Sequence, residues 1–411
     1  MWFNGGIKDM IHFFPTPYPE ELWLSVLCRY HVRSGNIKFA TTMEDLFGVD
    51  KRWTISAFFP TNAIHKIISQ LPTGFLDIRS IILNHTLFSY YLRMVPTERK
   101  EKILNDFCRG KGETLSWIWS SERTSDSVLR YCPLCCQEDI KAFGEPYWHT
   151  SHQLPLLTVC VKHKCKLESV IVGKRKDLNI KFFLPNEFCV PHFPNYEVKP
   201  HEILLANILD SYYRLPITVG PTAEYSNLAI GLSNAGYMDV FKRYHFIFNK
   251  DRVYNDLIAL YGQEQVEKVF GKEMAHFILA RIANWTLLTP ERYAMLSAMI
   301  NQSAEVMFGP KIPDLIEERI KNLKVTSRSK KDIAAQVGVK TYQLDALFNR
   351  YGLDPIWDQK PRSEEEKRRI VVKLYCTQQE KEELEAFVKE RDFPNISEML
   401  RYCFFKAKQN S

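Results

Sequence analysis

The sequence lacks any long hydrophobic run. None of its apolar stretches approaches the ~20 residues that a helix needs to cross a bilayer. The opening segment, residues 1–6, has no basic region leading into an apolar run, which a secretory signal would require. Low-complexity tracts and internal repeats are also missing. We therefore expect a globular, cytoplasmic protein that does not associate with membranes.

The common signatures of catalysis are missing as well. The chain has no glycine-rich phosphate loop followed by lysine, and it has no nucleophile elbow. It also has no spaced set of carboxylates typical of a metal-dependent nuclease. We predict that the protein is not an enzyme.

An excess of charge is present, but it is modest and unevenly placed. The net charge of the 411 residues is +7. From residue 321 to the end, 19 Lys and Arg face 14 Asp and Glu, so about +5 of this excess lies in the last quarter of the chain. A basic segment of this kind permits nucleic-acid binding.

The hydrophobic pattern predicts a mainly α, multidomain protein. A helix is expected from residue 20 to residue 34, ending at Gly35, because one of its faces is apolar. That face carries Leu22, Val26, Leu27 and Tyr30. Thr289 followed by Pro290 predicts the start of a later helix. The predicted parts are a helical region at 1–125, a loop-rich module at 126–200, a helical domain at 201–320, a helix-turn-helix at 321–358 and a β-α-α segment at 364–411.

Cysteine is concentrated between residues 132 and 165. Cys132 and Cys135 form one tight pair, and Cys160 and His163 form another about two dozen residues later. Each pair is spaced to offer two ligands to one tetrahedral zinc ion. Because four protein ligands leave no open position for water, we predict a structural zinc site. We expect no disulfides in a large chain of this type.

Neighbouring residues leave alternatives open. Cys136 or Cys165 could replace one ligand, and His149 or His152 could also approach the ion. Three further residues without a pairing rhythm are expected to be ordinary loop residues: Cys189, His192 and His201. The alternative to a metal site is a set of reduced thiols and an imidazole in a protein core.

Residues 331–350 fit a helix-turn-helix pattern. Ala334 is small where two helices would cross, and Gly338 would supply the turn. The shared apolar core would consist of Ile333, Val337, Val339, Leu344 and Leu347. A helical hairpin that never touches DNA could bury the same residues, so the pattern favours DNA recognition without requiring it.

The second helix of this motif would face DNA. Its N-terminal residues would lie nearest the base edges, and Arg350 would lie nearer a phosphate. The residues predicted to point outward are Lys340, Thr341, Tyr342, Gln343, Asp345, Asn349 and Arg350. Basic residues just upstream are predicted to contribute: Arg328, Lys330 and Lys331.

The last 45 residues predict a strand and two helices. Residues 367–376 alternate in polarity, with Arg369 and Lys373 on the outward face. Thr377 opens a capping box for a helix through about Arg391, and a second helix starts near Asn395. This order resembles the ribbon-helix-helix fold, which reads the major groove and requires a second copy, so DNA contacts and a homodimer follow. The alternative is a β-α-α appendage with a structural or dimerisation role.

Several motifs follow one another in the order typical of a known family. They are Pro17-Tyr18-Pro19-Glu20-Glu21-Leu22, His85-Thr86-Leu87-Phe88-Ser89-Tyr90-Tyr91, Arg130-Tyr131-Cys132-Pro133-Leu134-Cys135, Gly144-Glu145-Pro146-Tyr147-Trp148, Leu154-Pro155 and Cys160-Val161-Lys162-His163 with Leu167 following. Over about the first 170 residues the sequence resembles the TniQ/TnsD family of bacterial transposon proteins, which select the insertion site. One departure is Lys164-Cys165, where the family usually has glycine soon after the final histidine.

The resemblance implies a function and partners. The chain would bind double-stranded attachment-site DNA sequence-specifically and recruit an AAA+ ATPase that regulates transposition. An alternative within the family is an adaptor docked on an RNA-guided CRISPR effector complex, with no sequence reading of its own. An unrelated zinc-containing transcription regulator is a third interpretation, which the ordered N-terminal motifs disfavour.

Overall fold

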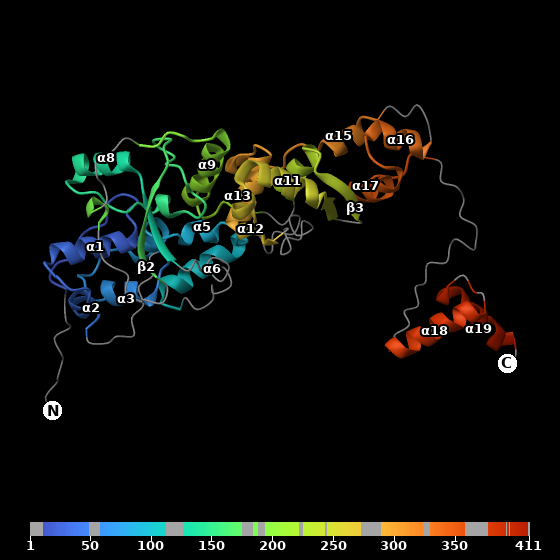
Figure 1. The fold of residues 1–411 in the computed structure, drawn as a ribbon, viewed down its shortest axis with the longest axis horizontal. Helices are drawn as coiled ribbons and strands as arrows, with labels where there is room; N and C mark the ends of the chain where they lie inside the picture. The colour runs from blue at the N-terminus through green and yellow to red at the C-terminus, as the bar shows by residue number, and fades with distance from the viewer. Residues whose placement is uncertain are drawn as a thin grey trace. The chain divides into compact units, whose positions relative to one another are not determined.

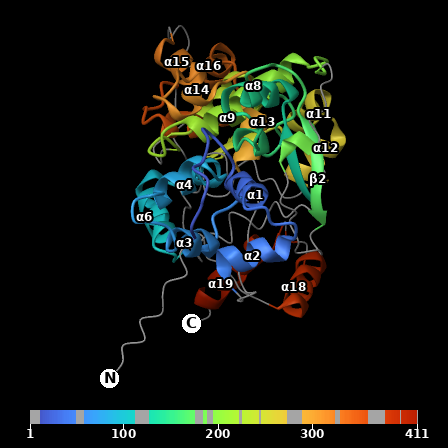
Figure 2. The same ribbon diagram turned by 90° about the vertical axis from the view of Figure 1, so that its left-hand side faces the viewer.

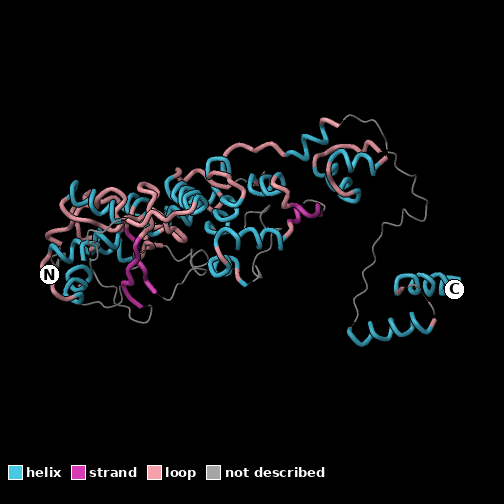
Figure 3. Tube along the Cα trace, turned by 45° about the horizontal axis from the view of Figure 1, so that its top comes forward, coloured by secondary structure: helices cyan, strands magenta, loops and turns pink. Residues whose placement is uncertain are grey.

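The chain forms two units in this computed structural model, residues 1–357 and residues 358–411 (Figure 1). The structure describes residues 11–48, 58–111, 126–174, 184–187, 194–221, 225–242, 245–272, 289–323, 329–357, 377–391, 393 and 395–409. Over these ranges helices dominate, as predicted, and the strands form two short antiparallel pairs (Figure 3). No helix within them is both long enough and apolar enough to cross a membrane.

Short helices build the N-terminal part and lie together in Figure 1 and Figure 2. They are α1 (Trp23–Arg33), α2 (Phe39–Phe47), α3 (Asn62–Ile68), α4 (Ile78–Asn84), α5 (Phe88–Leu92) and α6 (Thr97–Cys108). The apolar face predicted for the first helix is buried, but α1 begins three residues later than predicted. Glu20 has a left-handed backbone with a φ of 56°, and Leu22 is extended at the N-cap, so neither continues a right-handed helix.

Segments that are far apart in the sequence meet at the start of α1. The backbone N–H of Leu22 donates to the carbonyl of Trp148 at 2.7 Å. The N–H of Trp23 donates to the carbonyl of His85, also at 2.7 Å. Backbone hydrogen bonds thus join the motifs at residues 17–22, 85–91 and 144–148.

A buried ion pair reinforces this junction. Arg29 on α1 donates to Glu21 at 2.7 Å, and these side chains are only 2% and 0% exposed. Arg29 also donates to Glu145 at 2.9 Å, and its guanidinium lies 3.5 Å from the centre of the Tyr18 ring. Burial raises the pKa of Glu21, whereas the charge of Arg29 lowers it. The buried carboxylate therefore depends on Arg29 for its stability.

The cysteine-rich segment is more regular than predicted. β1 (Asp126–Tyr131) pairs antiparallel with β2 (Glu168–Lys174), and α8 (Pro133–Phe143) follows β1 directly. The 3₁₀ turns are η3 (Ser151–Gln153) and η4 (Pro185–Glu187). Tyr131, just before α8, lies opposite Glu168 in the sheet, so the residues that immediately precede Glu168 lie near the start of α8. The two-stranded sheet therefore brings the two predicted ligand pairs together.

The middle of the first unit is helical, as predicted, with one exception. Its helices are α9 (Pro200–Arg214), α10 (Asn227–Asn234), α11 (Lys250–Tyr261), α12 (Gln263–Phe270), α13 (Pro290–Met299), α14 (Ala304–Phe308) and α15 (Leu315–Lys321). The predicted helix start is confirmed, since Thr289 is the N-cap of α13. The exception is an antiparallel pair, β3 (Met238–Lys242) and β4 (His245–Phe248). Residues that favour strands over helices explain it: Val240, Phe241, Phe246 and Ile247.

Two buried basic side chains hold the turn that follows α9. Arg93, 1% exposed, donates to carbonyls at the end of this helix and just beyond it. These acceptors belong to Tyr212, Leu215, Pro216 and Val219. Lys100, also 1% exposed, donates to the carbonyl of Val219 at 2.6 Å. Burial lowers the pKa of Arg93 to about 10, and burial together with the charge of Arg93 lowers that of Lys100 to about 7.

The remaining elements lie near the C-terminus. The first unit ends with α16 (Lys330–Val337), the 3₁₀ turn η7 (Thr341–Gln343) and α17 (Leu344–Arg350), and the ring of Trp357 packs edge-on against Phe348. The second unit contains α18 (Gln378–Glu390) and α19 (Ile396–Gln409). The finer domain boundaries expected within the first unit stay a prediction.

We expect Arg29→Ala to destabilise the protein by about 3–5 kcal/mol, because it leaves a fully buried carboxylate without its cation. Arg33→Ala is the matched control, since Arg33 contacts the same Glu145 but is 38% exposed. The Arg33→Ala variant should lose less than about 1 kcal/mol of unfolding free energy. Urea unfolding followed by tryptophan fluorescence measures both values, and similar losses in the two variants would contradict the assignment.

The stability of the protein should rise between pH 7 and pH 9. The unfolded chain keeps the Lys100 proton over this range, whereas the folded chain, with a pKa of about 7, releases it. The gain should be about 2 kcal/mol at pH 9 relative to pH 7. Lys100→Met should flatten this part of the stability profile, as measured by urea midpoints at several pH values. An unchanged slope in the variant would show that another group titrates.

Candidate metal centre and DNA-reading elements

The first ligand pair lies at the junction of β1 and α8. Cys132 is the residue between the strand and the helix, and Pro133 occupies the first helical position, where no N–H is needed. Cys135 lies in the first turn of the same helix, and the N–H of Cys136 closes that turn on the Cys132 carbonyl at 3.0 Å. A strand followed directly by a helix therefore fixes both thiols on one side of the junction.

The second pair lies in a tight turn. The N–H of Cys160 donates to the carbonyl of Cys165, and the N–H of Lys164 donates to the carbonyl of Cys160, both at 2.8 Å. Lys164 has a left-handed φ of 53°, a conformation that glycine adopts without strain. Lys164 therefore adopts the backbone conformation that a glycine would take at this position. The lysine departs from the family pattern, but it does not move His163 out of the cluster.

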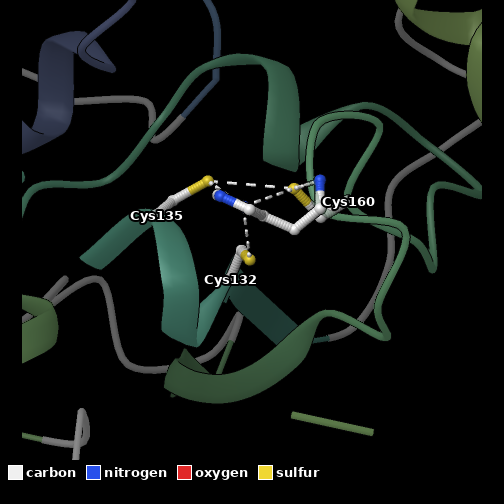
Figure 4. A group of neighbouring side chains, drawn as sticks. Cys132, Cys135 and Cys160 are labelled. Atoms are coloured by element: carbon white, nitrogen blue, oxygen red, sulfur yellow. Dashed lines mark hydrogen bonds between the residues drawn. The ribbon is translucent and has the colours of Figure 1, made fainter. Parts of the chain in front are cut away.

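The four predicted ligands converge on one point. Figure 4 shows the three cysteines among them, Cys132, Cys135 and Cys160, with their sulfurs close together. Their ligand atoms all lie within 4.8 Å of one another, and the three cysteines are buried. The Cys135 and Cys160 sulfurs are 3.8 Å apart, and Nδ1 of His163 lies 3.3 Å from the Cys135 sulfur. Two thiolates bound tetrahedrally at ~2.3 Å from zinc would be about 3.8 Å apart. Three thiols and one imidazole at these distances could hold a metal ion.

Hydrogen bonds among the thiols of the cluster shift their pKa values in opposite directions, and they raise the pKa of Cys135. Hydrogen bonds with Cys135 and Cys160 lower the pKa of the Cys132 thiol. A thiolate is the form that binds metal. None of the eight cysteines within the described ranges forms a disulfide.

The alternative ligands occupy different places. The Cys165 sulfur is 3.5 Å from that of Cys132, and Nε2 of His152 is 3.7 Å from the Cys135 sulfur, so both border the cluster. Cys136 packs in the N-terminal core, and His149 pairs with Asp139 at 2.8 Å. Of the predicted loop residues, His201 packs edge-on against Tyr261, whereas Cys189 and His192 lie outside the described residues.

One residue of this site was not predicted from the sequence. Glu138 on α8 has Oε1 at 3.2 Å from Nε2 of His163, the ring nitrogen that faces away from the thiols. A carboxylate in this position fixes the tautomer and orientation of a metal-binding histidine. Its position one helical turn after Cys135 is the signal that could have identified it.

The helix-turn-helix is present with the predicted core. The side chains of Ile333, Ala334, Val337, Leu344 and Leu347 are at most 2% exposed, and Val339 is partly buried against them. Gly338 ends α16 in the left-handed conformation with a φ of 79°. The turn glycine and the small crossing residue therefore have the roles predicted for them.

The residues predicted to point outward, and the basic residues just upstream of them, differ in exposure. The exposed members are Lys331, Lys340, Thr341, Tyr342, Asp345 and Asn349. Lys330 is half-buried, pairs with Asp345 at 2.7 Å and lies over the ring of Trp357. Arg350 is also half-buried, and this burial lowers its pKa. Arg328 lies outside the described residues.

Gln343 does not point outward, so that prediction is wrong. Its side chain is 3% exposed, and its Oε1 accepts a hydrogen bond from the N–H of Lys340 at 2.7 Å. The glutamine therefore caps the start of η7. This capping bond competes with any contact to a base.

In the second unit, both predicted helices are confirmed. Thr377 and Glu380 form the expected capping box, with a hydrogen bond from the N–H of Thr377 to Glu380 at 2.7 Å. The N–H of Glu398 donates to the side chain of Asn395 at the start of α19. The predicted strand, with Arg369 and Lys373, lies outside the described residues.

Comparison with known proteins agrees with the arrangement of the first part of the chain. The sequence model of the TniQ family matches residues 12–167, a range that includes the joined N-terminal motifs and all four predicted ligands. Over 155 residues the chain is 28% identical to the transposon Tn7 transposition protein TnsD of Escherichia coli. This match covers 36% of the chain and 30% of that relative, so it spans less than a third of the TnsD protein. Residues 12–167 thus match the TniQ domain, and the similarity to TnsD is limited to a segment of about this length.

Proposed function

We propose that the protein selects the target site for transposition by binding attachment-site DNA. The observation that carries this proposal is the presence of a TniQ domain and a helix-turn-helix in one unit of the same chain. The relative that it resembles is a transposition protein. A chain that combines the two can hold DNA with one part and present the other to the transposition machinery.

The exposed residues of the helix-turn-helix support sequence reading. Lys340, Thr341 and Tyr342 lie together at the start of the second helical segment, and Tyr342 is 57% exposed. Such residues lie nearest base edges when a recognition helix enters the major groove. Lys331, exposed on α16, is placed to neutralise a phosphate.

We infer that the cluster of Cys132, Cys135, Cys160 and His163 binds zinc as a structural brace. Its donor set and spacing suit zinc, and four protein ligands leave no position for a reacting water. Sites of this kind supply roughly 10–16 kcal/mol of apparent folding free energy. The brace holds α8 against the turn at 160–163.

The C-terminal unit suits a homodimer. Within the described residues, α18 has no buried side chain, and the exposed apolar residues of the unit include Phe387, Leu400 and Tyr402. A helix such as α18, with none of its side chains buried, needs a partner to form a core. A second copy would supply it, as in a ribbon-helix-helix protein.

We further propose that the chain recruits an AAA+ ATPase to the chosen site. Other proteins would then cleave the DNA strands and hydrolyse ATP. The competing role, an adaptor on an RNA-guided CRISPR complex, has no support in the described residues. It becomes an outcome of the DNA test below.

Selection of DNA fragments by the full chain, followed by sequencing, should return one preferred site. Lys340→Ala and Tyr342→Ala should each reduce discrimination for that site by about 1–3 kcal/mol. Lys331→Ala should instead weaken all sequences alike and reduce the salt slope by about 1. Lys268→Ala, an exposed lysine on α12, is the control.

Equal losses of specificity in Lys331→Ala and Lys340→Ala would contradict the division between phosphate and base contacts. If the chain showed no DNA preference but bound a guide-RNA complex, the adaptor role would replace target reading.

Cys160→Ser should abolish zinc binding, measured by elemental analysis of the purified protein, and should open residues 132–165 to protease. Cys165→Ser is the matched control and should retain zinc, because Cys165 borders the cluster without joining it. Glu138→Gln should weaken zinc affinity by about 10–100-fold without abolishing it, since the glutamate only orients His163. If Cys165→Ser lost zinc and Cys160→Ser retained it, Cys165 would be the fourth ligand in place of Cys160.

A further inference from the structure

A groove passes beside the metal centre. One part, with a volume of about 390 Å³, is lined by α8, η3 and the turn at 160–162. A second part, of about 640 Å³, is lined by residues 83–85 and the end of α9. Pro19, Glu20 and Arg214 line both parts, so the two meet at the ion pair that Glu20 forms with Arg214.

Carboxylates outnumber cations in the part next to the metal centre. Its charged side chains are Glu20, Glu138, Asp139 and Asp210 against Lys162 and Arg214. Each carboxylate already has a partner in the chain, since Arg214 pairs with both Glu20 and Asp210, Lys162 pairs with Glu138, and His149 pairs with Asp139. Because the carboxylates outnumber the lysine and arginine, this part of the groove is acidic, although the chain as a whole carries a net charge of +7. Phosphate groups of DNA would be repelled here, and a basic ligand would be attracted.

The groove also has an aromatic wall. Phe143 is 38% exposed at its edge and stacks on Tyr18, with ring centres 4.4 Å apart. Tyr147 lines the same wall. A planar guanidinium can stack on such rings while its N–H groups pair with carboxylates, whereas an ammonium group does so less well.

The chain already contains one example of this recognition. Arg29 stacks on Tyr18 and donates to Glu145 on the buried side of the same aromatic cluster. The groove contains the same kinds of group, aromatic rings next to carboxylates, and a guanidinium from solution would share these carboxylates with their partners in the chain.

We propose that this groove binds an extended, arginine-containing segment of the ATPase that the chain recruits. The inference rests on the proposed function, because it identifies the surface and the chemistry of that recruitment. Recruitment and DNA reading then use opposite charges: an acidic groove in the TniQ domain and α9, and basic residues in the helix-turn-helix.

The probe is a fluorescein-labelled peptide of alternating glycine and arginine, titrated with the full chain and followed by anisotropy. Binding should weaken with added salt, and a glycine–glutamate peptide should not bind. Phe143→Ser and Glu20→Gln should each weaken binding on the order of tenfold, through loss of a stacking partner or of a charge.

The controls lie on the same unit outside the groove. Ile140→Ser changes an apolar residue on α8 that is 46% exposed, and Glu44→Gln changes an exposed acid on α2. Both should leave peptide binding unchanged. Equal binding by all variants, or equal loss in the controls, would overturn the assignment of this groove. Zinc content, measured in each variant, verifies that the metal centre is intact.

Capture of the ATPase encoded by the same transposon separates this inference from the proposed function. If the wild-type chain captures the ATPase and Phe143→Ser captures it equally well, recruitment stands and the groove assignment fails. If the peptide binds the groove but the wild-type chain captures no ATPase, the groove remains an arginine site and the recruitment role fails.

Discussion

The buried ion pair between Glu21 and Arg29 is the constraint on which the N-terminal half depends. A carboxylate with no exposed surface is stable only when a cation compensates it, and Arg29 does this while also holding Glu145. The pair therefore fixes the N-terminal motif against the segment that leads to η3. With Glu21 fixed, Glu20 takes its left-handed conformation and extends its carboxylate to Arg214. One edge of the groove follows from that geometry.

The metal centre holds the same region from its other side. Residues 144–152 lie in the sequence between the two ligand pairs. Their backbone forms hydrogen bonds with the residues at the start of α1. An ion that joins α8 to the turn at 160–163 would thus stabilise the wall of the groove without entering a reaction. The charges are also divided, because acidic residues lie beside the metal centre and the exposed Lys331 and Lys340 lie on the helix-turn-helix. A partner protein and DNA would then not compete for one surface.

Much of this could be predicted from the sequence because the relevant signals are local. Two ligands separated by two residues can meet one ion wherever the rest of the chain goes, so the spacing of Cys132 and Cys135 identified half of the site. The core of the helix-turn-helix was predicted equally well, since helical periodicity and one glycine determine it. Capping signals likewise placed the starts of α13 and α18.

The remaining features were decided by contacts between distant residues. Gln343 is an exception, because a helical projection turns its polar side chain outward but the side chain caps the N–H of Lys340, only three residues earlier. Glu138 became part of the metal centre only when the sheet brought His163 beside α8. The sequence by itself determined the resemblance to the TniQ/TnsD family, the spacing of the ligand pairs and most of the helices, because these depend on neighbours along the chain. The contact of Arg29 with Glu145 and that of Glu20 with Arg214 at the groove were decided by the tertiary structure, because the residues of each pair are more than a hundred positions apart and meet only when the chain is folded.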